Sequence, residues 1–198
     1  KVYRGKKDDV LDRYYQAAKK NGAKAVVRIT GDCPLMDPSV VDKVVGYYLK
    51  QKSRYDYISN VHPSTFPDGM DVEVFSLKAL GDAWLHARLP SEREHVTPYI
   101  WKRPKTFRLG NIVGPGHFPR LRLTLDNPED LILIRTVFKY LYPRNHCFTL
   151  SDIFKLFKKK PELAFINAGL TRNEGLLKSL EQDKLFLRRK RFTNISKG

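Results

Sequence analysis

Two aspartates in this 198-residue sequence stand at positions where acidic side chains often carry chemistry. Asp32 follows the β-rich run 25–30 (AVVRIT), and Asp126 follows the run 121–125 (LRLTL). Ligands of open α/β sheets bind beyond the carboxyl ends of the strands, so we predict that both side chains face one crevice. One or two carboxylates commonly hold a magnesium ion that bridges phosphates, and this pair suits that need. A turn at Asp32 and helix capping beside Asp126 are the structural alternatives.

Three further acids lie in the segment 66–73 (FPDGMDVE), namely Asp68, Asp71 and Glu73. Asp71 and Glu73 are two residues apart on an expected strand, so they share a face. Two like charges on one face are costly unless a cationic or polar group meets them. The segment is therefore a candidate binding surface, with a solvent-facing strand edge as the alternative.

The segment 91–97 (SEREHVT) combines a cation, an acid and a histidine. Arg93 could hold a carboxylate or phosphate through two hydrogen bonds, and His95 could donate to a substrate oxygen or exchange a proton. Glu94 is three residues after Ser91, which predicts a capping box. A surface salt-bridge face is the alternative for Arg93 and His95. Arg28 lies inside the apolar run 25–30 and requires a partner, either structural or a phosphate.

The elements that would position these residues alternate along the chain. Helices are expected at 10–21, from 37–38, at 76–88, from 91, at 127–141 and as shorter pieces within 151–186, and strands are expected at 25–30, 55–59, 70–75, 107–113 and 121–125. This alternation predicts an α/β domain with a largely parallel sheet.

Composition argues for some classes of function and against others. The net charge is +16, and residues 101–198 hold 21 of the 37 basic side chains but 8 of the 21 acidic ones. Such a balance suits an anionic partner, yet the sequence has no RRM, KH or zinc-knuckle motif, so a solvated basic surface is favoured over nucleic-acid binding. The two cysteines are far apart, which argues against a disulfide scaffold and suits a reducing cytoplasm. No apolar run reaches 18 residues, so we expect no membrane partner.

Five blocks carry a family resemblance in the right order. They are 2–15 (VYRGKKDDVLDRYY), 26–38 (VVRITGDCPLMDP), 66–75 (FPDGMDVEVF), 91–101 (SEREHVTPYIW) and 121–131 (LRLTLDNPEDL). Together they resemble the cytidylyltransferase family of spore coat polysaccharide biosynthesis, which is related to the acylneuraminate and 3-deoxy-manno-octulosonate cytidylyltransferases. The match extends from Val2 to about Lys184.

The resemblance implies a three-layer α/β/α fold of the nucleotide-diphospho-sugar transferase type, Rossmann-like, with a mostly parallel mixed sheet. It implies a cytoplasmic enzyme that transfers CMP from CTP to a sugar acid with Mg²⁺ and releases pyrophosphate. Related enzymes are commonly homodimers. We expect a partial catalytic domain at residues 1–186 and a frayed basic tail at 187–198. A glycosyltransferase of related fold and a basic nucleic-acid-binding module are the alternative functions.

The matching blocks also imply roles for individual residues. The block GDCPL assigns Gly31 and Asp32 to nucleotide and metal, and LDNPEDL assigns Asp126 to the metal. Our own mechanistic hypothesis adds that Arg28 or Arg13 helps to neutralise the phosphates in catalysis and that Arg93 clamps the sugar carboxylate. The nucleotide side is expected to include Arg4, Gly5, Asp9 and Arg13, and the sugar side Asp68, Asp71, Glu73, Arg93, Glu94 and His95.

One departure from the family pattern concerns the start of the chain. The family opens with a strand and a basic, glycine-containing loop of the type ARMGSTRLPGK, which cradles the triphosphate. No such segment is present, and the sequence begins at Lys1, directly before the RGKKDDVLDR block. We therefore expect an N-terminally truncated fragment that binds CTP poorly.

Overall fold

The computed structural model describes residues 2–114 and 121–195, with side chains as far as Arg189. The helices are α1 (Val10–Lys20), α2 (Pro38–Gln51), α3 (Leu77–His86), α4 (Pro90–His95), α5 (Pro98–Trp101), α6 (Pro128–Leu141), α7 (Leu150–Lys159), the 3-10 helix η1 (Pro161–Phe165) and α8 (Glu174–Ile195). The strands are β1 (Ala25–Arg28), β2 (Tyr57–Ser59), β3 (Glu73–Ser76) and β4 (Leu109–Asn111).

The four described strands form one mixed sheet in the order β1-β3-β2-β4. Strand β3 is antiparallel to both β1 and β2, whereas β2 and β4 are parallel. The α/β class is confirmed, but the sheet is not mostly parallel. The reason lies between β2 and β3, where the chain returns through residues 60–72 without a helix, and a direct return of this kind pairs strands in opposite directions.

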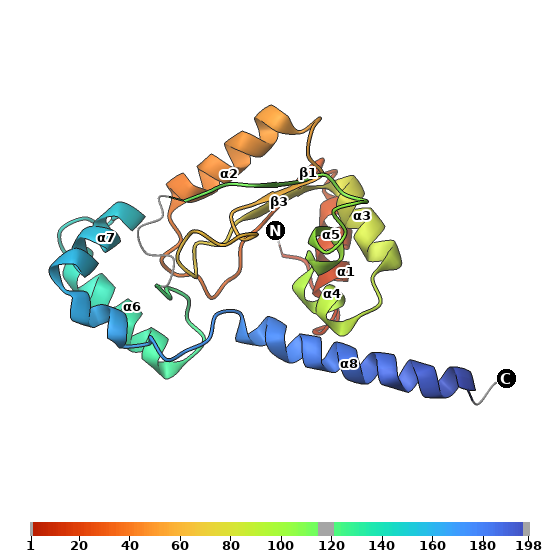
Figure 1. Cartoon of the computed structure of the whole chain (residues 1–198). Coiled ribbons are helices and arrows are strands. Elements are labelled where there is room, and N and C mark those ends of the chain that lie inside the picture. The colour runs from red at the N-terminus through yellow and green to blue at the C-terminus, as the bar shows by residue number, and fades with distance from the viewer. Residues whose placement is uncertain (1, 115–120, 196–198) are drawn as a thin grey trace.

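Successive strand residues alternate between two hydrophobic cores, one on each face of the sheet. Ile58 and Val74 belong to the core that α2, α6 and α7 cover. Tyr57 and Phe75, their neighbours along the strands, belong to the core that α1 and α3 cover. Figure 1 shows α2 and the α6–α7 pair separated by the sheet from α1, α3, α4 and α5. The α/β/α layering follows from this alternation.

Capping side chains fix where the first helices begin. Asp9 accepts a hydrogen bond from the backbone N–H of Asp12 at the start of α1, and Ser76 serves α3 in the same way. The buried carboxylate of Asp37 caps two helices at once. Its Oδ1 accepts from the N–H of Ser39 in α2 at 2.8 Å, and its Oδ2 accepts from the N–H of Leu150 in α7 at 2.7 Å.

The segment 121–125 is not a strand, contrary to prediction, because its backbone bonds to loops. The N–H of Asp68 donates to Leu121 O at 2.9 Å, and Leu123 N–H donates back to Asp68 O at 2.8 Å. Leu125 N–H donates to Asp32 O at 2.8 Å. Gly69 permits this close approach, since its φ is +91° and a Cβ there would lie 2.6 Å from the Leu123 carbonyl carbon. The segment thus fastens two loops together.

The start of α4 also differs from expectation. Glu92, not Glu94, caps the helix, because its Oε2 accepts the backbone N–H groups of Arg88 and Leu89. The hydroxyl of Ser91 is directed instead to α8, where it donates to Asp183 Oδ2 at 2.6 Å. The expected capping box of Ser91 and Glu94 is therefore wrong, since both side chains contact α8.

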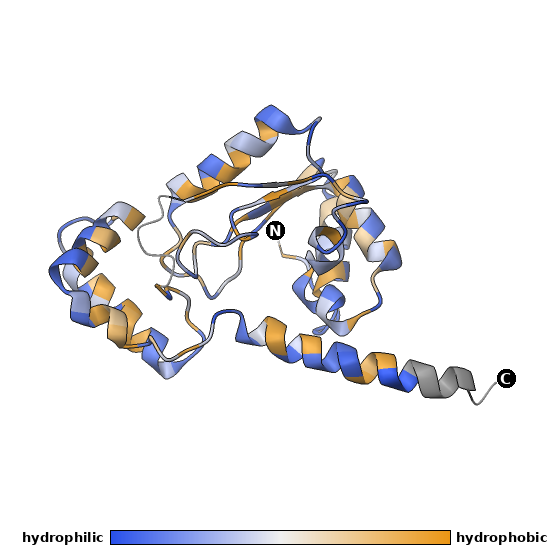
Figure 2. Cartoon of the chain, viewed as in Figure 1, coloured by the Kyte–Doolittle hydropathy of each residue, from blue (hydrophilic) through white to orange (hydrophobic). Residues whose placement is uncertain are grey.

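Helix α8 lies along the body and extends beyond it toward the C-terminus (Figure 1). Figure 2 shows hydrophilic and hydrophobic residues interspersed along it. The helix passes residues 186–187 without a break, so the basic segment that we expected to be frayed is helical as far as Ile195. Within the described ranges, no helix combines the length and apolar character needed to cross a bilayer.

Candidate active site

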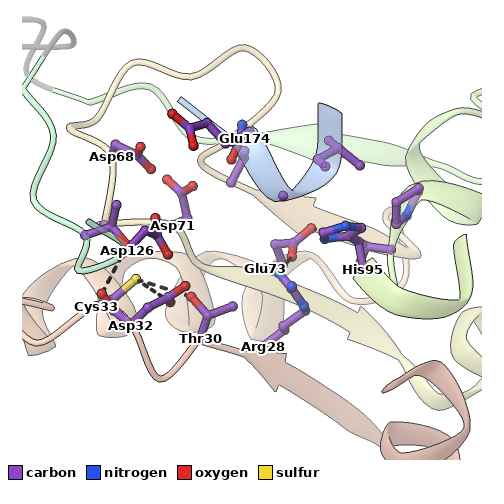
Figure 3. Close-up of a pocket in the computed structure, with 18 of the residues that line it drawn as sticks. Arg28, Thr30, Asp32, Cys33, Asp68, Asp71, Glu73, His95, Asp126 and Glu174 are labelled. Atoms are coloured by element: carbon purple, nitrogen blue, oxygen red, sulfur yellow. Dashed lines mark hydrogen bonds and ion pairs between the residues drawn. The ribbon is translucent and has the colours of Figure 1, made fainter. Parts of the chain in front are cut away.

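A cleft of about 370 Å³ opens beyond the end of β1. Figure 3 shows carboxylates from several loops directed into it. Its walls come from β1 and the turn after it, the β2–β3 loop, the α4–α5 region, the segment before α6 and the first turn of α8. The charged and histidine side chains that line it are Arg28, Asp32, His62, Asp68, Asp71, Glu73, His95, Asp126, Glu174 and Lys178.

Asp32 and Asp126 line this one cleft, as the sequence predicts. Two hydrogen bonds hold their segments together: Leu125 N–H and the Thr124 hydroxyl both donate to the backbone oxygen of Asp32, at 2.8 and 3.1 Å. The side chain of Asp32 is half-buried, and that of Asp126 is 47% exposed. The two carboxylates are accordingly open to a ligand while their backbones are fixed.

A buried arginine, Arg122, anchors the acidic end of the cleft. Its guanidinium contacts Asp126 at 2.6 Å, Asp130 at 2.9 Å and Asp68 at 3.2 Å. Burial alone would raise the pKa of Asp130, but hydrogen bonds from Arg122 and from Asn167 outweigh it and leave the pKa lowered. Arg122 therefore pairs at once with Asp126, a carboxylate of the cleft wall, and with the fully buried Asp130.

Asp68 and Asp71 share a second arginine, Arg172. Its Nη2 donates to Asp71 Oδ1 at 2.6 Å, and its Nε lies 3.7 Å from Asp68 Oδ1. Burial raises the pKa of Asp71 to about 6, against the opposing attraction of Arg172. Burial likewise raises the pKa of Asp68. The negative charges of Asp68 and Asp71 are thus compensated by the guanidinium of Arg172, as the sequence requires.

Glu73 lies at the floor of the other end and accepts three hydrogen bonds. Its Oε2 accepts from Arg28 Nη1 at 2.6 Å, and its Oε1 accepts from the hydroxyls of Tyr57 at 2.6 Å and Thr97 at 2.7 Å. Arg28 and Glu73 are opposite each other in the β1–β3 register. The partner that Arg28 requires is therefore this cross-strand carboxylate.

His95 lines the cleft at the junction with α8. Its Nε2 is 2.9 Å from the Ser179 hydroxyl, which donates to Glu94 Oε2 at 2.6 Å. Burial lowers the pKa of His95, more than the neighbouring Glu94 raises it. His95 is consequently neutral at pH 7. Glu94 is exposed on the outer side and does not line the cleft.

The structure does not bring the remaining expected residues to the cleft. Arg93 donates to Asp9 Oδ2 at 2.6 Å and to the backbone oxygen of Trp84, in a separate open hollow. Arg13 donates to Lys6 O. None of Arg4, Gly5, Asp9, Arg13, Gly31 and Arg93 is among the described residues that line the cleft. The expected approach of Arg93 to the sugar side does not occur, because its guanidinium is directed to the start of α1.

Sequence reasoning missed several lining groups. The first turn of α8, residues 173–178, forms one wall of the cleft. His62 and Trp101 form another part, with ring centroids 4.4 Å apart. A Trp in the run Pro98–Trp101 gives no local signal of a cleft, and α8 is distant in sequence from every other wall element.

Comparisons with known proteins show which family and fold this chain is similar to. A family model described as cytidylyltransferase matches residues 1–191. The protein MJ1063 of Methanocaldococcus jannaschii is 36% identical over 171 residues, which cover 85% of this chain and 68% of that protein. The spore coat polysaccharide biosynthesis protein SpsF of Bacillus subtilis is 30% identical over 167 residues, covering 83% of this chain and 67% of SpsF. The structure of a cytidylyltransferase from Leptospira borgpetersenii aligns with a TM-score of 0.78 at 33% identity, over 82% of this chain and 68% of that one.

Proposed function

The chain belongs to the cytidylyltransferase family, and on that premise we propose that it transfers CMP from CTP to a sugar acid and releases pyrophosphate. One observation carries the proposal. Two partly exposed carboxylates, Asp32 and Asp126, line one cleft, and a backbone hydrogen bond between Leu125 and Asp32 joins the segments that carry them. The cleft is large enough for a small-molecule substrate.

The donor set suits Mg²⁺. That ion prefers oxygen ligands and usually takes one or two carboxylates while keeping waters and substrate phosphates in its remaining positions. Asp32 and Asp126 would hold it as two carboxylate ligands; nowhere in the described residues do three or more acidic, histidine or cysteine side chains converge on one metal position. When bound, the ion would neutralise phosphate charge and lower the pKa of an attacking hydroxyl.

The chain's own residues contribute fixed positions. Arg122 holds the Asp126 side chain, and Thr124 and Leu125 hold the backbone of Asp32, so the segments that carry the two carboxylates need not reorganise when substrate binds. Asp71, with its pKa of about 6, is the cleft carboxylate best matched to accept a proton from a sugar hydroxyl near neutral pH. Positioning and charge neutralisation of this kind supply most of the rate in phosphate transfer.

The test is a calorimetric titration of this chain with CTP, with and without Mg²⁺, using GTP as the specificity control. We expect CTP binding that is weak, because the family's basic, glycine-containing loop is not among these 198 residues, but that is selective over GTP and requires Mg²⁺. Asp32→Asn and Asp126→Asn should each weaken it at least about tenfold, as expected when one charged ligand is lost. Asp42→Asn, an exposed change on α2, is the matched control and should leave it unaltered. Binding that ignores Mg²⁺ and both variants would contradict the proposal.

A further inference from the structure

The two ends of the cleft differ in the charge of the side chains that line them. Figure 3 places Asp32, Asp68 and Asp126 toward one end and Arg28 with His95 toward the other. At the acidic end, Arg122 and Arg172 are already engaged by carboxylates. An anionic substituent on an acceptor would be repelled there by the wall carboxylates, whose arginine partners have no charge left to offer it.

Arg28 is the cation best prepared to meet such a substituent. Among the described residues that line the cleft, Arg28 and Lys178 are the lysine and arginine side chains. Lys178 is exposed on α8, whereas the Arg28 side chain is 18% exposed and is held by Glu73 at 2.6 Å. Burial would lower the pKa of Arg28, but Glu73 beside it more than compensates, so the guanidinium stays charged.

The guanidinium also has donors to spare. Within the part of the chain that the structure describes, its hydrogen bonds go to Glu73 alone, from Nη1. Its other nitrogens are not among the buried atoms that lack a partner, so they keep some exposure, and Arg28 lines the cleft. The Glu73 carboxylate cannot turn away, since hydroxyls of Tyr57 and Thr97 hold its second oxygen. A planar fork fixed in this way is suited to a carboxylate, which it can bind through two parallel hydrogen bonds.

We propose that Arg28 binds the carboxylate of the acceptor sugar acid and that Glu73 is the positioning residue that aims it. The inference rests on the proposed function for the identity of the acceptor. It assigns to Arg28 the contact that the sequence pattern favours for Arg93, whose guanidinium is committed to Asp9 instead. The acceptor therefore enters with its acid group toward β1 and β3.

The test compares acids with esters. The whole chain is titrated calorimetrically with N-acetylneuraminate and with 3-deoxy-manno-octulosonate, each beside its methyl ester. We expect at least one acid to bind the unaltered chain about 10- to 100-fold more tightly than its ester, the value of a charge-assisted hydrogen-bonded pair. Arg28→Met should remove that difference, and Arg28→Lys should restore part of it.

Two further variants keep the result interpretable. Arg28→Met combined with Glu73→Gln avoids leaving a buried carboxylate unpaired, in case the single variant does not fold. Arg93→Met tests the competing assignment. Equal binding of acid and ester by the unaltered chain, no binding of either, or a difference that survives in folded Arg28 variants would overturn the inference. So would loss of the difference in Arg93→Met alone.

CTP titrations of the same proteins separate this inference from the proposed function. If Arg28→Met loses CTP affinity while the acid–ester difference persists, Arg28 contacts phosphate, so the inference is wrong and the function stands. If the chain never binds CTP but discriminates acid from ester through Arg28, the function is wrong and the acid subsite stands.

Discussion

Replacing Arg122 with methionine should be among the most damaging single changes in this protein. The side chain is 6% exposed, and its guanidinium donates to Asp130, to Asp126, to Asp68 and to the backbone oxygen of Thr171. Methionine fills a similar volume but donates no hydrogen bond. The change would leave the wholly buried Asp130 without its cation.

The magnitude follows from that buried charge. Removing one partner of a buried ion pair costs about 3–5 kcal/mol of unfolding free energy, because the remaining charge is desolvated and unpaired. Asn167 and two backbone N–H groups still donate to Asp130, which argues for the lower half of that range. For a chain of this length, about 3 kcal/mol corresponds to a fall in Tm of roughly 6–12 °C.

Urea denaturation at pH 7 and at pH 3 provides the assay. The pKa of Asp130 is lowered in the folded state, so its contribution to stability is full above its ordinary value of 3.8 and is lost as the pH falls below that value through the folded pKa. The difference between unaltered and Arg122→Met protein should therefore be smaller at pH 3. Arg108→Met, at an exposed ion pair with Asp56, is the control and should cost less than about 1 kcal/mol. A loss below about 1 kcal/mol for Arg122→Met, or one independent of pH, would refute the reasoning.

Three other changes test the site and its supports. Gly69→Ala should lower the unfolding free energy by about 2 kcal/mol or more in urea melts and weaken CTP affinity, because its Cβ would strike the Leu123 backbone at a positive φ. Asp71 should titrate near pH 6 by carbon-detected NMR. Because its folded pKa is raised from 3.8, the protonated side chain stabilises the fold fully below pH 3.8, and this stabilisation is lost as the pH rises through 6. In the unaltered protein the unfolding free energy should therefore fall by up to about 3 kcal/mol between pH 4 and 7, and Asp71→Asn should abolish that fall. Ser91→Ala should leave Asp183 short of a donor, cost about 1–3 kcal/mol and speed amide exchange along α8, and unchanged exchange would contradict that role.

Local patterns were sufficient wherever a feature depends on neighbours in the sequence. Helices begin directly after Asp9, Asp37 and Ser76, as the expected ranges 10–21, from 37–38 and 76–88 predict, and each of these side chains accepts from a backbone N–H two or three residues further on. The alternation within the strands was enough to place Arg28 away from Val27 and Ile29, both of which are exposed.

Features that depend on distant partners could not be predicted. Arg93 pairs with a carboxylate 84 residues away, and Arg172 with one 101 residues away. A single sequence shows which side chains need a partner but not which partner the fold supplies. The prediction of a strand at 121–125 was wrong for the same reason. The residues alternate as in a strand, but their backbone partners, Asp32 and Asp68, are loop residues.

The two helix starts that share Asp37 have a consequence for how the protein is made. Its carboxylate accepts from the backbone N–H of Ser39 in α2 and from that of Leu150 in α7, and Leu150 lies 113 residues downstream of Asp37. At typical ribosomal speeds that interval takes on the order of 10 s, during which one oxygen of the carboxylate faces only water. Helix α2 can pack on β2 and β3 as soon as residues 38–76 have been made, whereas the part of this core that α7 covers can close only after α7 has left the ribosome.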